Sequence, residues 1–386
     1  MREVLERVVD WLGEGKPVAL ARVVEVVGSG VRTAGAAIAL DGSGEVVGSA
    51  SGGCVEGALV EAARNVLASG GPPRMVVFGC SDDEAFDIGL TCGGQVRTLL
   101  ERLEPSQAGW VAELAARVRA GAGVALLEVV EGPADLVGTK ALVAAADLKA
   151  AGDSAPADPQ RPDLFGPEVA QDALADLAAE RSAVHTYSPG PAGEARRLGV
   201  FVDTYPAPPR MLIVGAASFT AALAAQAKLL GYRVTVCDAR SVFASAARFP
   251  MADEVVVGWA DRYLAGAGDG FGPRDAICVL THDPKFDVPT IRAAVHTRAG
   301  YIGVMGSRRT QADRRRRLVE AGLSAADLGR LRGPLGLDLG ASSPEETAVS
   351  ICAEIVALRS GRPGLPLTEG TAPVHAVPAV NLPDPA

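Results

Sequence analysis

The chain has 386 residues, of which 48% are hydrophobic, and its formal net charge is −9. Because that length exceeds what one ordinary hydrophobic core holds, we expect two domains. The negative charge argues against nucleic acid as a general partner, and no apolar run reaches the ~18–20 residues that a membrane-spanning helix needs.

The cysteines and the first residues indicate the compartment. The six cysteines are scattered and form no CxxC pair, which argues against a zinc site and a disulfide framework. Residues 1–12 have the pattern of an amphipathic helix and not that of a signal peptide. We therefore expect a cytoplasmic protein in a reducing environment.

The first hundred residues predict a domain of mixed helices and strands. Strands are expected over residues 17–27, 36–40, 75–79 and 95–100. Arg32 lies on the loop between the first two strands and is a candidate anion contact, although a solvated loop arginine explains it equally well.

The most informative stretch of this half is GSASGGCVEG, residues 48–57. Apolar residues recur at helical spacing from residue 55 onward, so Cys54 is expected in the first turn of a helix, where the helix dipole favours a thiolate. Gly52 and Gly53 have no Cβ, so a bulky anionic ligand can approach their backbone amides. With Glu56, they are candidate cofactor-binding residues.

A second segment, GLTCGG at residues 89–94, has the same chemistry. It places Cys92 beside Gly93 and Gly94, and we expect both glycine-flanked cysteines to face one pocket. The alternative is two ordinary glycine-rich turns with small buried cysteines. Three other cysteines lie in apolar segments and are expected in the core: Cys237, Cys278 and Cys352.

The middle of the chain is less informative, and its end contains the clearest linker. Helices are expected over residues 107–119 and 168–181, and strands over 123–130, 140–146 and 200–203. The proline-rich segment 205–209 is typical of a connection between domains.

From residue 211 onward, strands and helices alternate, which is typical of a doubly wound parallel sheet. Strands are expected over residues 211–214, 233–237, 254–257, 276–281 and 301–304. The ligand crevice of such a sheet lies at the carboxyl ends of the strands. Residues 361–386 are proline-rich without periodicity and are expected to be disordered.

The turn after the first of these strands is similar to a dinucleotide-binding fingerprint but departs from it. The pattern G-x-G-x-x-G would have glycine where Ala217 and Thr220 stand, so two Cβ atoms occupy the space that a pyrophosphate needs. Either NAD(P) binds here or the Rossmann scaffold has lost or changed its ligand. The candidate contacts are Gly215, Ala217, Ser218, Asp238, which is well placed for a ribose hydroxyl, and Arg240.

Two further strand ends carry polar residues. His282 is a candidate base or ligand contact, and a cap of the following helix explains it equally well. The turn at residues 306–309 offers free amides, a hydroxyl and two guanidiniums, which favours a phosphate. Its candidate residues are Gly306, Ser307, Arg308 and Arg309. The alternative is that these arginines extend a solvated basic face at residues 314–317.

Several segments together are similar to one family. They are SGGCVE (51–56), GLTCGG (89–94), THDPK (281–285), YIGVMGSRR (301–309), and GLDLG (336–340) with PEE (344–346). In this order they resemble the XdhC/CoxI family of accessory proteins for xanthine dehydrogenase and related molybdenum hydroxylases. The resemblance implies an α/β protein: an N-terminal α+β domain over residues 1–206, a Rossmann-like domain over 207–360, and a tail.

The resemblance also implies a function in cofactor maturation. Such proteins bind the molybdenum cofactor (molybdopterin or its cytosine dinucleotide form), protect it while sulfur replaces its terminal oxo ligand, and deliver it. The implied partners are an apo molybdenum hydroxylase and a cysteine desulfurase-type sulfur donor. Cys54 and Cys92 are then the catalytic candidates and the molybdenum contacts, since thiolates are soft ligands.

The chain departs from the family in its Rossmann turn, where members usually have more glycine and often His at the position of Ser218. We interpret the chain as a maturation chaperone without catalytic turnover of its own. We also expect a homodimer, because a labile ligand must be enclosed and one small domain covers little of it. The rival interpretation is an NAD(P)-dependent oxidoreductase with His282 as acid–base. A third is an adaptor between proteins.

Overall fold

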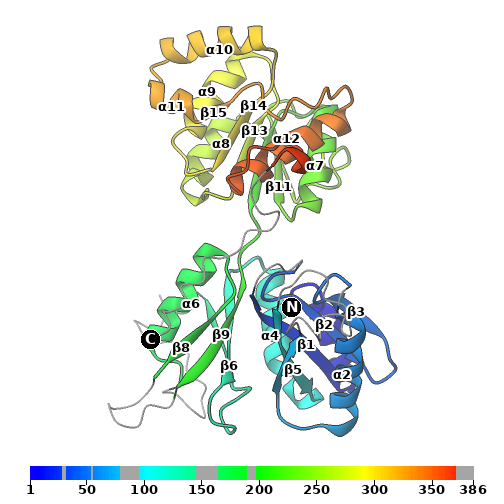
Figure 1. Ribbon diagram of the computed structural model, residues 1–386. Coiled ribbons are helices and arrows are strands. Elements are labelled where there is room, and N and C mark those ends of the chain that lie inside the picture. The colour runs from blue at the N-terminus through cyan, green and yellow to red at the C-terminus, as the bar shows by residue number, and fades with distance from the viewer. Residues whose placement is uncertain (28–31, 54, 79–94, 145–163, 189–196, 371–386) are drawn as a thin grey trace. The chain divides into compact units, whose positions relative to one another are not determined.

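Within the described residues, the chain divides into two compact units, residues 1–207 and residues 208–370 (Figure 1). The computed structural model describes residues 1–27, 32–53, 55–78, 95–144, 164–188 and 197–370. Across these ranges, no helix combines the length and the apolar character that crossing a membrane requires.

The first unit contains a five-stranded antiparallel sheet of order β3-β2-β1-β5-β4. Its strands are β1 (Val18–Val27), β2 (Ala37–Asp41), β3 (Val46–Ser49), β4 (Arg74–Phe78) and β5 (Gln95–Leu103). Side chains alternate across a strand, so Val18 and Leu20 of β1 pack with α1 (Leu5–Gly13) and α4 (Ala108–Arg119). Ala19 and Ala21 pack on the other face with α2 (Glu56–Ser69).

A second antiparallel sheet of the same unit has the order β7-β6-β9-β8. It consists of β6 (Val124–Glu131), β7 (Lys140–Ala144), β8 (Ala183–Tyr187) and β9 (Leu198–Tyr205). One face is covered by α6 (Pro167–Ala179). The other contributes Leu126 and Tyr205 to the core that contains α1 and α4, so the two sheets share one hydrophobic interior. The sequence did not indicate β8.

A buried group of charges lies inside that interior. Arg22 on β1 is fully buried and forms ion pairs with Glu101 on β5 and Glu128 on β6. Lys140 on β7 lies 2.7 Å from a carboxylate oxygen of each of these glutamates. Asp203 on β9 is 3.6 Å from the Arg22 guanidinium. These charges therefore connect strands of both sheets.

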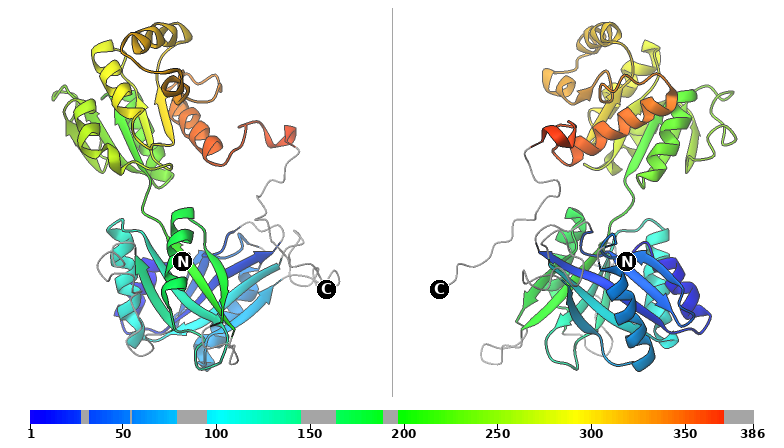
Figure 2. Two further views of the ribbon diagram at one scale, coloured as in Figure 1. Left: turned by 90° about the vertical axis from the view of Figure 1, so that its left-hand side faces the viewer. Right: turned by 45° about the vertical axis from the view of Figure 1, so that its right-hand side comes forward.

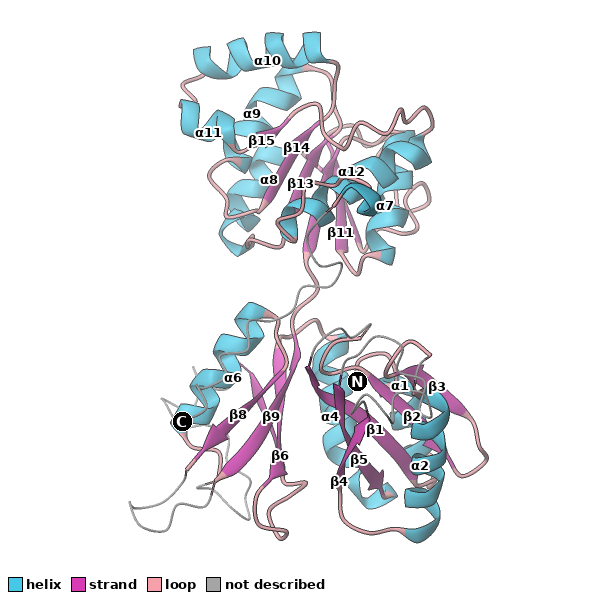
Figure 3. Ribbon diagram, viewed as in Figure 1, coloured by secondary structure: helices cyan, strands magenta, loops and turns pink. Residues whose placement is uncertain are grey.

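The second unit is built on a six-stranded parallel sheet of order β12-β11-β10-β13-β14-β15, drawn in magenta in Figure 3. Its strands are β10 (Arg210–Val214), β11 (Arg233–Asp238), β12 (Glu254–Val257), β13 (Ala276–Val279), β14 (Tyr301–Val304) and β15 (Leu331–Arg332). The predicted α/β class with a doubly wound parallel sheet is confirmed. The short β15 was not predicted, and β13 ends two residues earlier than expected.

Helices cover both faces of this sheet. Met211 and Ile213 of β10 point toward α7 (Ser218–Leu229) and α12 (Pro344–Arg359). Leu212 and Val214 point to the opposite face, which is covered by α8 (Ala260–Ala267), α9 (Pro284–Ala294), α10 (Arg308–Glu320) and α11 (Ala325–Gly329). Figure 2 shows the orange α12 and the yellow helices on opposite sides. Both faces of β10 are therefore apolar.

The end of the described chain differs from the expectation of disorder after residue 360. Residues 361–370 are described and include a short 3₁₀ turn, Leu367–Glu369. The remainder of that segment, residues 371–386, lies outside the described residues.

Candidate functional site

The polar residues that the sequence singled out in the second unit lie at one edge of its sheet. Because all six strands are parallel, their carboxyl ends meet there. The chain passes from β10 through β11 to β12 and then returns to the other side of β10 at β13. The gap between the ends of β10 and β13 is therefore the switch point at which such sheets bind ligands.

Gly215 sets the shape of the turn at this switch point. Its φ is +105°, and a Cβ built on it would lie 2.8 Å from Cγ2 of Thr281, the second residue after β13. Its amide donates a hydrogen bond of 2.9 Å to the carbonyl of Cys237 at the end of β11. The glycine therefore serves close packing between strand ends.

The carboxylate of Asp238 is hydrogen-bonded to neighbouring groups of the protein itself. Its carboxylate accepts hydrogen bonds from the amide of Ala216 at 2.8 Å and from the amide of Arg240 at 2.8 Å, and the Arg240 guanidinium binds both oxygens. Burial raises the pKa of Asp238, but the bonds from Arg240 and the two amides outweigh it, so the pKa lies below its usual value. Each carboxylate oxygen of Asp238 therefore already accepts two hydrogen bonds, which leaves neither free for the expected contact with a ribose hydroxyl.

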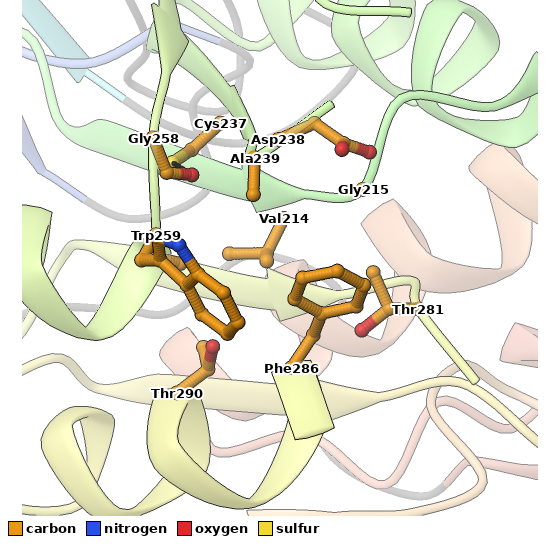
Figure 4. A pocket seen from close by; sticks show the side chains of 11 residues that line it. Val214, Gly215, Cys237, Asp238, Ala239, Gly258, Trp259, Thr281, Phe286 and Thr290 are labelled. Carbon is orange, nitrogen blue, oxygen red and sulfur yellow. Dashed lines mark hydrogen bonds between the residues drawn. The ribbon is translucent and has the colours of Figure 1, made fainter. Parts of the chain in front are cut away.

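Two aromatic rings fill the switch point. Trp259, which follows β12, and Phe286 on α9 have ring centroids 5.1 Å apart and line a cavity of only about 10 Å³ (Figure 4). A single water needs roughly 10–15 Å³, so the space that these rings enclose holds about one water. Neither ring was predicted from the sequence, although Trp259 follows β12 as His282 follows β13.

The three described cysteines lie in the core, as expected. Cys237, Cys278 and Cys352 are buried, and burial raises the pKa of the Cys237 thiol to about 12 and that of Cys352 to about 11. Burial raises the pKa of Cys278 as well. A thiol that stays protonated at neutral pH is a poor nucleophile and metal ligand.

His282 is exposed, and the described chain gives its side chain no hydrogen-bond or ion-pair partner. The helix that follows it is capped by its neighbour instead: the Asp283 side chain accepts a hydrogen bond from the Lys285 amide at 3.1 Å. The interpretation of His282 as a helix cap is therefore wrong, and its imidazole is available.

The turn at residues 306–309 is only partly available to a phosphate. The Ser307 hydroxyl accepts a hydrogen bond from the Thr310 amide at 3.2 Å and so caps α10. Arg308 and Arg309 are exposed, and Arg308 lies 4.0 Å from Asp338. Gly306 has a φ of +136°, which allows the turn.

Arg314 was grouped with a solvated basic face, and this expectation is wrong. The residue is buried, and its Nε and Nη2 atoms donate to one carboxylate oxygen of Asp287 at 3.1 and 2.7 Å. Asp287 also accepts a hydrogen bond from the Thr281 hydroxyl. Leu318, four residues after Arg314, is buried too, and this helical spacing was the available signal.

In the first unit, the glycine-rich turn before α2 is occupied by Glu56. The carboxylate accepts hydrogen bonds from the amides of Ser51, Gly52 and Gly53 at 2.9, 2.8 and 2.7 Å, and from the hydroxyls of Ser49 and Ser51. Burial raises the pKa of Glu56, yet these donors lower it to about 2. The amides expected to receive an anionic ligand therefore bind a side chain of the turn itself.

The remaining predictions for this unit concern the thiols and Arg32. Cys54, Cys92, Gly93 and Gly94 lie outside the described residues, so their shared pocket stays a prediction. Helix α2 begins at Glu56 with Val55 as its N-cap, so the prediction that Cys54 lies in the first turn of this helix is wrong. Arg32 is half-buried and forms an ion pair with Glu3, so the candidate anion contact already has a carboxylate.

Comparisons with known proteins agree with this two-unit architecture. Residues 11–79 match the model of the XdhC and CoxI family, and residues 211–355 match that of the XdhC Rossmann domain. A crystal structure of a xanthine dehydrogenase from Bacillus halodurans has the same fold, with a TM-score of 0.66 at 24% identity over 93% of this chain and 96% of that chain.

Two relatives match over most of their length. The chain is 26% identical over 347 residues to a probable xanthine dehydrogenase subunit of Bacillus subtilis (strain 168), covering 88% of this chain and 92% of that protein. It is 25% identical over 358 residues to the molybdenum cofactor insertion chaperone PaoD of Escherichia coli (strain K12), covering 93% and 88%. With both of its units matched by the family's models, the chain belongs to the XdhC and CoxI family.

Proposed function

We propose that this protein is an accessory factor in the maturation of a molybdenum hydroxylase of the xanthine dehydrogenase type. It binds the molybdenum cofactor, protects it while sulfur replaces the terminal oxo ligand, and delivers it to the apo-enzyme. The observation that carries this proposal is the similarity, along about nine-tenths of both chains, to a molybdenum cofactor insertion chaperone.

The turn before α2 supports a ligand role for Cys54. Five donors from Ser49, Ser51, Gly52 and Gly53 bind the Glu56 carboxylate and so hold the chain that leads to the thiol. Thiolates are soft ligands that suit a sulfur-rich molybdenum centre. Cys54 and Cys92 are therefore the proposed contacts, and a cysteine desulfurase-type donor and the apo-hydroxylase are the proposed partners of a homodimer.

The second unit argues against the rival oxidoreductase. A dehydrogenase needs room for a nucleotide at the switch point, where the cavity measures about 10 Å³. The carboxylate expected to bind a ribose hydroxyl of NAD, that of Asp238, already accepts hydrogen bonds from Ala216 and Arg240. We therefore keep the chaperone as the single proposed function.

A reconstitution assay tests this proposal. Apo-hydroxylase is mixed with cofactor, sulfide donor and increasing amounts of the purified protein, and hydroxylase activity is measured after brief exposure to air. The proposal predicts that activity rises with the protein and that NADH fluorescence does not change on its addition. No gain in activity, together with enhanced and blue-shifted NADH fluorescence, would favour the oxidoreductase.

A further inference from the structure

A groove of about 190 Å³ lies between α9 and α10, and the proposed function does not use it. His282 and Asp287 line it from the side of α9, and Thr310, Asp313, Arg314 and Arg317 line it from α10. These helices cover the face of the sheet opposite α7. The groove is therefore separate from the first strand–helix turn, where a Rossmann fold binds the pyrophosphate of a dinucleotide.

The floor of the groove is a buried ion pair between Arg314 and Asp287. The Arg314 guanidinium donates to Asp287 at 2.7 Å, and both side chains are buried. Arg314 also donates to the carbonyl of Met305 at 3.0 Å and to the side-chain oxygen of Gln311 at 2.8 Å. This pair holds α9 and α10 together and contributes no net charge to the groove.

The rim of the groove carries unneutralised donors. Arg317 and His282 are exposed, and neither side chain has a hydrogen-bond or ion-pair partner in the part of the chain that the structure describes. The one carboxylate on the rim, Asp313, already accepts a hydrogen bond from Arg316 at 2.8 Å. A guanidinium and an imidazole are therefore left to meet an incoming group. The Thr310 hydroxyl lies 3.0 Å from the Ser307 hydroxyl, and when it accepts from Ser307 its own proton is free for the same group.

The size and the donor set restrict the class of ligand. Pockets for whole small molecules usually measure about 300–1,000 Å³, so this groove suits a single polar group. Guanidinium groups bind phosphates and carboxylates through paired hydrogen bonds. Because the donors stand on both walls, a tetrahedral phosphate with oxygens in several directions fits them better than a planar carboxylate.

We infer that the groove between α9 and α10 binds the phosphate or diphosphate group of a small molecule through Arg317, His282 and Thr310. The assignment replaces the expected cradle at residues 306–309, where the Ser307 hydroxyl caps α10. The inference goes beyond the proposed function and concerns the second unit alone.

Titration calorimetry on the full chain tests the inference with inorganic phosphate, pyrophosphate, CDP and ADP as probes at constant ionic strength. Arg317→Ala is compared with Arg315→Ala, which removes an exposed arginine of the same helix that does not line the groove. We expect Arg317→Ala to weaken pyrophosphate binding about tenfold or more, His282→Gln to weaken it less, and Arg315→Ala to change it less than twofold. Equal affinities for both arginine variants, or no binding by the wild type, would overturn the inference.

The nucleotide probes separate the sources of the phosphate. Binding of CDP and not ADP supports a cytidine-bearing ligand, and equal binding of pyrophosphate, CDP and ADP supports recognition of the diphosphate alone. Molybdenum retention is measured on the same samples. If the protein retains molybdenum but does not bind pyrophosphate, the phosphate site in the groove is overturned and the proposed function stands. If it binds pyrophosphate but does not retain molybdenum, only the proposed function is overturned.

Discussion

Glu56 accepts a hydrogen bond from the backbone amide of Gly53, with 2.7 Å between the nitrogen and the carboxylate oxygen. The same carboxylate binds the amides of Ser51 and Gly52. A residue inside the motif thus completes a nest of amides that an external anion would otherwise occupy. The turn before α2 is therefore shaped before any ligand arrives.

We expect Glu56→Gln to destabilise the first unit by about 1–3 kcal/mol, because charge-assisted hydrogen bonds from three backbone amides and two hydroxyls are weakened or lost. The effect depends on pH. Since the folded state lowers the pKa of Glu56 from 4.5 to about 2, its contribution is complete above pH 4.5 and is lost as the pH falls toward 2. Urea unfolding at several pH values between 6 and 3 should show a steeper loss of stability for the wild type than for the variant. Parallel curves would show that the carboxylate does not hold the turn.

Arg22→Ala should cost about 3–5 kcal/mol, because it leaves Glu101 and Glu128 buried with Lys140 as their remaining cation. The matched control is Arg7→Ala. Arg7 pairs with Glu45 on the surface, and such pairs contribute about 0–1 kcal/mol. The free energy of unfolding in urea measures both, and similar values for the two variants would contradict the assigned role of the buried cluster.

Gly215→Ala tests the close approach of the two strand ends at the switch point. The variant adds a Cβ that would meet Cγ2 of Thr281 at 2.8 Å, in addition to the strain of a positive φ. Gly231→Ala is the control, since its φ is +79° and nothing lies within 4 Å of its Cβ. We expect about 1–2 kcal/mol of backbone strain in the control and a larger loss in Gly215→Ala, measured as melting temperatures. Equal losses would mean that the contact with Thr281 relaxes freely.

The fold of the second unit was largely accessible from its sequence. Apolar residues on both faces of residues 211–214 and the regular alternation with helices indicate a parallel sheet covered on both sides. That arrangement also places Asp238, His282 and Ser307 at one edge, as the sequence analysis expected. Element type and the position of strand ends depend on local pattern, which a single sequence contains.

The burial and the hydrogen-bond partners of individual polar groups were harder to predict from the sequence, because the partners are distant in sequence. The helical spacing of Arg314 and Leu318 indicates the buried position, but nothing local identifies the partner of Arg314, since Asp287 lies on another helix. Asp238 lies at the end of its strand as predicted, but its carboxylate already accepts a hydrogen bond from the amide of Ala216. Glu56 is different: a glutamate three residues after Gly53 has the spacing of the reach-back half of a capping box, and this signal was overlooked.

The most direct test of the account measures molybdenum bound to the purified protein after gel filtration, by mass spectrometry, for wild type, Cys54→Ser and Cys92→Ser. Cys352→Ala is the control, because it removes a buried thiol of the second unit. The account predicts that wild type and control retain molybdenum and that either of the other variants loses it tenfold or more, which is about 1.4 kcal/mol. Equal retention by all four proteins would contradict the role of the two thiols, and no retention by the wild type would contradict cofactor binding itself.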